Sequence, residues 1–154
     1  MNKKTLVVGL GNPILGDDGI GWEAARLLAR EVLPPGVEVD SVALGGISLM
    51  ERLVGFERVV IVDAMNTGQF EVGSVQVFPL DTLPGPLTGH LASAHDATLS
   101  DALQMGRDLG AELPEEVLIV AVETPYVYDF SEELSPQART AVTVAVAEVL
   151  KILR

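Results

Sequence analysis

Short apolar runs, which predict buried strands, alternate along the chain with segments of helical periodicity. The clearest run lies at residues 58–64, where four β-branched residues in succession precede Asp63. The other predicted strands are residues 5–9, 37–43, 74–78 and 117–122, and the predicted helices are residues 18–32, 48–54, 96–109 and 135–154. Strands that alternate with helices predict a layered α/β domain.

The patterns within these segments also predict the place of one strand in the sheet and the first residues of two helices. Residues 74–78 alternate apolar and polar side chains, which is typical of a strand at the edge of a sheet. Asp96 is the expected N-cap of the helix at residues 96–109. Ser135, which proline follows, is the expected N-cap of the last helix.

Length and composition limit the function classes. The 154 residues, of which 48% are hydrophobic, predict a single domain over residues 1–154. The net charge of −12 would repel a phosphate backbone, so we expect no nucleic-acid partner. The absence of cysteine excludes disulfides, thiolate metal sites and a cysteine nucleophile. The first apolar run is too short for a signal sequence or a membrane span, so we expect a cytoplasmic protein without a membrane partner. We also expect a monomer.

A glycine-rich turn joins the first predicted strand to the first helix. Its sequence, Gly9-Leu-Gly-Asn-Pro-Ile-Leu-Gly-Asp-Asp-Gly19, does not fit a dinucleotide-binding turn, because Ile14 replaces the third glycine of that motif. A P-loop is excluded because no Gly-Lys-Ser/Thr follows. Asp17 and Asp18 stand instead at the helix entrance. Carboxylates there also gain about 0.3–1 kcal/mol from the helix dipole, so a structural role stays open.

Asp63 is the second candidate, since it ends the most apolar strand. In a doubly wound sheet the carboxyl ends of the first and third strands flank the crevice where ligands bind, so Asp63 should lie near Asp18. The two histidines, His90 and His95, follow on a long loop. Two carboxylates and one imidazole are a common ligand set for a divalent cation. A serine triad built from Ser93 and His95 is a weaker alternative, because adjacent residues seldom point into one site.

These residues resemble the motifs of the hydrogenase maturation endopeptidases. The similarity is carried by Gly9-x-Gly-Asn-x-x-x-x-Asp17-Asp18-Gly-x-Gly21, by Val62-Asp63-Ala64, and by Ser93-x-His95 ahead of a helix. Their order, spacing and strand context agree across nearly the whole chain.

The resemblance implies a three-layer α/β/α sandwich of the phosphorylase/hydrolase-like type, around a five-stranded mixed, mostly parallel sheet. It implies an endopeptidase that removes the C-terminal extension of a nickel–iron hydrogenase large-subunit precursor after nickel insertion. Carried over by position, the metal ligands are Asp18, Asp63 and His95, and the catalytic candidates are Asp18, Asp63 and Asp17. Nickel would be carried by the substrate, and zinc or cadmium could occupy the site in vitro. Catalysis by metal-activated water and by an aspartate base both remain open.

The chain departs from the family at two places. Asp18 stands where many relatives have glutamate, and Gly45-Gly46 is followed by Ile47 where relatives often have threonine after the glycine. Two alternative functions remain. A peptidyl-tRNA hydrolase-like esterase shares only the segment at residues 8–13, and a metallochaperone would use the same carboxylates without proteolysis.

Overall fold

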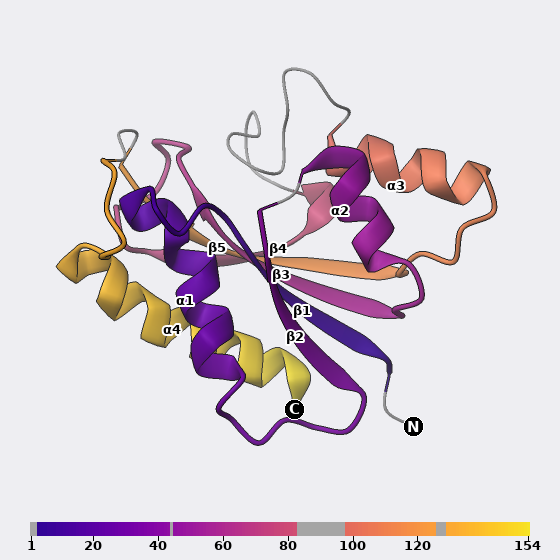
Figure 1. The fold of residues 1–154 in the computed structure, drawn as a ribbon, viewed down its shortest axis with the longest axis horizontal. Coiled ribbons are helices and arrows are strands. Elements are labelled where there is room, and N and C mark those ends of the chain that lie inside the picture. The colour runs from indigo at the N-terminus through magenta and orange to yellow at the C-terminus, as the bar shows by residue number, and fades with distance from the viewer. Residues whose placement is uncertain (1–2, 44, 83–97, 126–128) are drawn as a thin grey trace.

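The computed structural model describes residues 3–43, 45–82, 98–125 and 129–154 (Figure 1). A five-stranded sheet forms its centre, with strand order β2-β1-β3-β5-β4. The strands are β1 (Thr5–Leu10), β2 (Val37–Val42), β3 (Arg58–Met65), β4 (Val75–Pro79) and β5 (Glu116–Glu123). Strand β4 pairs antiparallel with β5 at one edge, and the other pairs are parallel. The predicted mixed, mostly parallel sheet and the edge position of residues 74–78 are confirmed.

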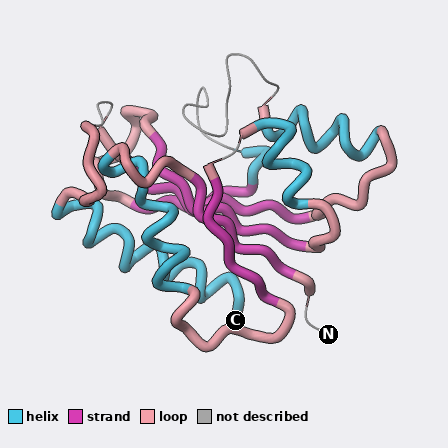
Figure 2. Tube along the Cα trace, in the orientation of Figure 1, coloured by secondary structure: helices cyan, strands magenta, loops and turns pink. Residues whose placement is uncertain are grey.

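Helices cover both faces of the sheet, which gives the predicted three layers (Figure 2). Helices α1 (Ile20–Leu28) and α4 (Pro136–Leu153) lie on one face, and α2 (Gly46–Leu53) and α3 (Leu99–Asp108) lie on the other. Successive residues of β3 point to opposite faces: Val59 packs in the core beneath α2 and α3, and Val60 in the core beneath α1 and α4. This double burial explains why the strand is apolar throughout.

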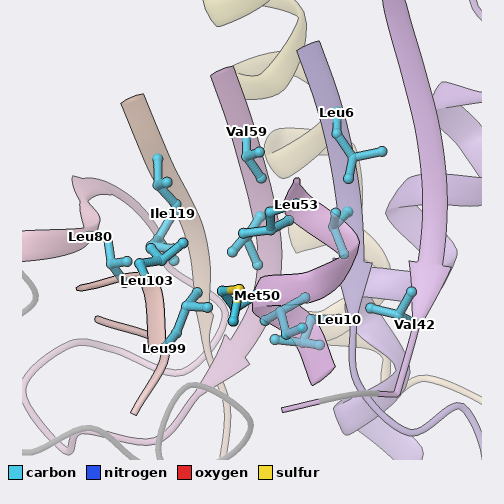
Figure 3. Packing of buried hydrophobic residues seen from close by; sticks show 14 of the residues in the cluster. Leu6, Leu10, Val42, Met50, Leu53, Val59, Leu80, Leu99, Leu103 and Ile119 are labelled. Atoms are coloured by element: carbon cyan, nitrogen blue, oxygen red, sulfur yellow. The ribbon is translucent and has the colours of Figure 1, made fainter. Parts of the chain in front are cut away.

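The core beneath α2 and α3 is built mainly from aliphatic side chains (Figure 3). Met50 and Leu53 of α2 lie over the sheet, and Leu103 of α3 packs beside them. Val59 and Ile119 present the sheet's side of the same core. The low aromatic content, 5% of the chain, is therefore compatible with two complete cores.

The helix boundaries differ from the predicted ones by a few residues, most clearly at the first and third helices. The segment Gly16–Gly19 forms a 3-10 turn, η1, so the regular helix α1 begins at Ile20 and ends at Leu28. The prediction that Asp96 caps the third helix is wrong, because α3 begins at Leu99 and its N-cap is Thr98. The Thr98 side chain accepts a hydrogen bond from the N–H of Asp101 at 3.2 Å.

The start of the last helix was predicted correctly. Ser135 is the N-cap of α4, where its Oγ accepts a hydrogen bond from the N–H of Ala138 at 3.2 Å, and Pro136 occupies the first turn. Across the described ranges, none of the helices has both the length and the apolar composition needed to cross a membrane.

Candidate active site

Helix α1 docks on the sheet through glycines that let backbone touch backbone. A Cβ atom at Gly21 would lie 2.4 Å from the carbonyl oxygen of Val62 and 2.5 Å from that of Leu10. A Cβ atom at Gly9 would lie 2.1 Å from the carbonyl oxygen of Gly21. Only glycine fits at these two positions, so the first turn of α1 is held directly against β1 and β3. The 3-10 turn η1, which precedes α1, contacts β3 for the same reason.

This packing places Asp18 and Asp63 at the same end of the sheet. Asp18 lies three residues before Gly21, and Asp63 directly follows Val62, whose carbonyl faces Gly21. Strand β1 lies between β2 and β3, so the chain runs to opposite sides of β1 after its first and second strands. The carboxyl ends of β1 and β3 therefore flank the switch point of the sheet, as predicted. Both side chains are buried, with 6% of Asp18 and 1% of Asp63 exposed.

The Asp18 carboxylate is oriented by the glycine-rich turn itself. Its Oδ2 accepts a hydrogen bond from the N–H of Asn12 at 3.0 Å, and the N–H of Asp18 donates to the carbonyl of Leu15 at 3.1 Å. The turn therefore fixes both the backbone and the side chain of Asp18. A buried carboxylate in a fixed orientation is suited to hold a cation or to accept a proton.

Asp17 has a different environment. Its Oδ1 accepts a hydrogen bond from the N–H of Ser135 at 2.7 Å, and its Oδ2 accepts one from the Ser135 hydroxyl at 2.8 Å. Asp17 thus joins the turn η1 to the start of α4, across 118 residues of sequence. This geometry favours a positioning role for Asp17, and its predicted catalytic role has no contact here to support it.

A second connection between the same segments involves backbone atoms. The N–H of Gly16 donates to the carbonyl of Ser131 at 2.9 Å, and the N–H of Ser131 donates to the carbonyl of Ile14 at 2.9 Å. Leu15 and Ser131 form an isolated parallel bridge. The glycine-rich turn is therefore clamped by the loop that leads into α4.

A buried glutamate that the sequence analysis missed lies at the carboxyl end of β5. Glu123 is 2% exposed, and both of its carboxylate oxygens bond to the loop after β3. Oε2 accepts from the N–H of Thr67 at 2.9 Å, and Oε1 accepts from the Thr67 hydroxyl at 2.5 Å. Glu123 stands opposite Met65 in the sheet register, two residues along from Asp63. The signal that could have revealed it is a charged residue directly after the apolar run at 117–122, at the same end of a parallel strand as Asp63.

The predicted third ligand cannot be placed, because Ser93, His90 and His95 lie outside the described residues. Over the described part of the chain, no group of three His, Cys, Asp or Glu side chains could hold a metal ion. The donor chemistry nevertheless fits a divalent cation, since buried carboxylates at one end of the sheet need a compensating charge or hydrogen bonds. A complete ligand set would need a further donor from another segment or from a bound substrate.

The turn after β2 contains the Gly45-Gly46-Ile47 segment. Gly46 has a φ of 50°, which favours glycine, and it begins α2. Ile47 follows it with 39% of its surface exposed, so this turn presents an apolar side chain to solvent.

Comparison with known proteins agrees with this geometry. Hydrogenase expression/formation protein HupD of Thiocapsa roseopersicina is 28% identical over 149 residues, which are 96% of this chain and 66% of HupD. The chain thus spans about two thirds of the length of that relative. The hydrogenase maturating endopeptidase HybD of Escherichia coli superposes with a TM-score of 0.80 and 25% identity, covering 100% of this chain and 93% of HybD.

A second solved structure gives a similar result. The [NiFe] hydrogenase maturation protease HybD of Thermococcus kodakarensis superposes with a TM-score of 0.75 and 26% identity, and all of both chains is covered. The family model described as "Hydrogenase maturation protease" matches residues 23–152, and the two structural superpositions extend the similarity over the glycine-rich turn that precedes this range. By its sequence and by its fold, this chain belongs to the hydrogenase maturation protease family.

Proposed function

We propose that this protein is an endopeptidase that removes the C-terminal extension of a nickel–iron hydrogenase large-subunit precursor after nickel insertion. The observation that carries the proposal is the placement of two buried carboxylates, Asp18 and Asp63, at one end of the sheet by close contact between α1 and the strands. Proteins of similar fold that are named as hydrogenase maturation proteases support the protease over a metallochaperone or an esterase acting on tRNA.

In this proposal Asp18 and Asp63 bind a divalent ion together with His95. The site has no thiolate of its own, since the chain lacks cysteine, so it leaves coordination positions open for a nickel ion carried by the substrate. A shared ion would polarise the scissile carbonyl or a water molecule. It would also place the carboxylates beside the peptide bond to be cut, so that geometry supplies the specificity. Zinc or cadmium could take the same ligands in vitro.

The chain's own residues supply the rest of the proposed mechanism. The Asn12 N–H holds the Asp18 carboxylate in place, so that it can bind the ion or take a proton from the attacking water. Asp17 acts through Ser135, whose two donors it binds, and keeps the turn η1 fixed against α4. We therefore assign Asp17 to positioning and Asp18 and Asp63 to the reaction.

The test is to incubate the protein with nickel-loaded and nickel-free precursor and to follow C-terminal shortening by mass spectrometry. We expect the loaded form to be processed and the nickel-free form to remain intact at the same protease concentration. Asp18→Asn and Asp63→Asn should abolish processing, while the control Asp101→Asn, at an exposed position of α3, should keep it. Equal cleavage of both forms would contradict the role of nickel, and a failure to cut either form would contradict the endopeptidase.

The choice of histidine has its own test. His95 immediately precedes the residues that lead into α3, so we propose it as the ligand in preference to His90. His95→Ala should abolish processing and His90→Ala should not. Loss of processing with His90→Ala alone would show that the other histidine is the ligand.

A further inference from the structure

Two apolar side chains are exposed beside the turn that carries Asp17 and Asp18. Phe130 is 86% exposed and Ile14 is 48% exposed. They occupy neighbouring positions, because Ile14 precedes Leu15 and Phe130 precedes Ser131 in the two segments that form the parallel bridge. A large aromatic side chain left this exposed is unusual on a folded domain and marks an interaction surface more often than an isolated aliphatic residue does.

The exposed position of Phe130 is fixed by the fold. The residue that follows it, Ser131, both donates to and accepts from the segment at 14–16, each time at 2.9 Å. The same segment is bonded to the N–H of Asp18 through the carbonyl of Leu15 at 3.1 Å. Ile14 therefore lies four residues before the candidate catalytic carboxylate of Asp18, and Phe130 is joined to the same segment through the backbone of Ser131.

The surroundings of Phe130 are acidic. Asp129, Glu132 and Glu133 are exposed on the same loop. Throughout the described segments, the salt bridges found are Lys3–Glu116, Arg26–Glu23, Arg52–Asp40 and Lys151–Glu148, and none of them neutralises this loop. We call the five residues Ile14, Asp129, Phe130, Glu132 and Glu133 the Phe130 surface.

A groove continues from this surface. It has a volume of about 530 Å³ and is lined by Pro13, Gly19, Trp22, Glu132 and Leu134, among other residues. Gly19 belongs to the turn η1, and Pro13 precedes Ile14, so the groove joins the Phe130 surface to the segment that carries Asp18. An extended peptide could lie along both at once.

We propose that the Phe130 surface docks a segment of the protein substrate in which an apolar side chain is flanked by lysine or arginine. This inference rests on the function proposed above and adds the chemistry by which the substrate is recognised. Phe130 would supply the aromatic anchor that dominates many protein interfaces, and the three carboxylates would select basic neighbours and speed association. Because the Phe130 surface is joined to the turn that carries Asp18, the bound segment would lie close to the peptide bond that is cut.

The first test compares Phe130→Ser with Val32→Ser. Val32 is the matched control: it is 89% exposed, and it lies between α1 and β2 at the opposite end of the sheet. With nickel-loaded precursor, Phe130→Ser should raise KM about tenfold or more with kcat within about twofold, since burial of a phenylalanine is worth at least one factor of ten in affinity. Val32→Ser should leave both constants unchanged, and Phe130→Leu should recover part of the loss. Neither side chain is buried, so the melting temperatures should stay equal.

The second test addresses charge. The double variant Glu132→Gln/Glu133→Gln should raise KM at low salt, and the difference from the wild type should shrink as ionic strength rises. Glu31→Gln, exposed beside Val32, is the control. An unchanged KM in Phe130→Ser overturns the docking surface while the endopeptidase stands. A wild-type dimer that Phe130→Ser converts to a monomer, measured by sedimentation, overturns it in favour of self-association. Absence of processing by the wild type overturns the proposed function itself.

Discussion

Replacing Gly21 with alanine perturbs the contact on which the position of Asp18 depends. The new Cβ atom would lie 2.4 and 2.5 Å from two backbone carbonyl oxygens, and neither can rotate away as a flexible side chain would. Restoring an ordinary contact requires α1 to move by about 1 Å. Overpacking of this kind costs about 1–3 kcal/mol, and the helix gains back up to about 1 kcal/mol from alanine.

We therefore expect Gly21→Ala to lower the free energy of unfolding by about 1–2 kcal/mol, which is about 2–8 °C in melting temperature for a chain of this size. The effect on processing should be larger than the effect on stability. A displacement of about 1 Å at a reacting group can reduce the rate by about 100-fold. Because η1 and α1 are continuous, Asp18 would move with the helix and Asp63 would not.

Chemical denaturation followed by circular dichroism measures the first effect, and the rate of precursor shortening below the melting transition measures the second. Gly106→Ala is the matched control, also inside a helix. The atoms nearest to its added Cβ belong to the flexible Leu113 and Met50 side chains, at 2.8 and 3.0 Å, and these can shift. We expect Gly106→Ala to change stability by less than about 1 kcal/mol and to leave processing intact. A Gly21→Ala protein with wild-type stability and rate would refute the argument that backbone contact positions Asp18.

Three further predictions concern single interactions. Asp17→Ala should cost about 1.5–3 kcal/mol of stability, because it removes the acceptor of the Ser135 N–H and hydroxyl. The double variant Asp17→Ala/Ser135→Ala should cost less than the sum of the two single changes, because both remove the bond from the Ser135 hydroxyl; strict additivity in denaturant titrations would contradict the pairing. Glu123→Gln should cost about 1–3 kcal/mol, because the charged acceptor of the Thr67 N–H and hydroxyl becomes a neutral amide, and denaturant titrations that show no loss would contradict a stabilising role for these bonds. The hydrogen bond from Arg26 lowers the pKa of Glu23, so Glu23 stabilises the fold above the unfolded pKa and loses that contribution as the pH falls through the folded value. Glu23→Gln should therefore cost no more than about 0.5 kcal/mol at pH 7, and the difference from wild type should vanish once the pH lies below the folded pKa of Glu23; a difference that persists in stronger acid would show another cause.

The parts of the fold that depend on local pattern could be predicted from the sequence. Strand β3 is buried on both faces, so its unbroken apolar run is enough to predict a strand at this place. Ser135 with Pro136 marks the start of α4 in the same way. Because the carboxyl ends of parallel strands meet at one edge of a sheet, the sequence also predicts that Asp18 and Asp63 lie at the same end.

The remaining features depend on contacts between distant residues. Thr98 rather than Asp96 caps α3, because the start of that helix is decided by how it packs against α2, and two nearby residues could both serve as caps. The bonds between Glu123 and Thr67 span 56 residues. The Ser135 hydroxyl caps α4 and also donates a hydrogen bond to Asp17. The sequence motif predicts the cap but not the bond to Asp17.

The most direct test of the central claim is whether Asp18 and Asp63 act as one unit. The measurement is the rate of processing of nickel-loaded precursor by Asp18→Asn, by Asp63→Asn and by the double variant, with unfolding followed in parallel to show that all three are folded. Residues that act together on one ion or one water molecule give losses that do not add. We predict that each single change removes nearly all of the activity and that the double variant is no slower than the slower single one. Losses that multiply, with each single variant retaining substantial activity, would contradict a shared site.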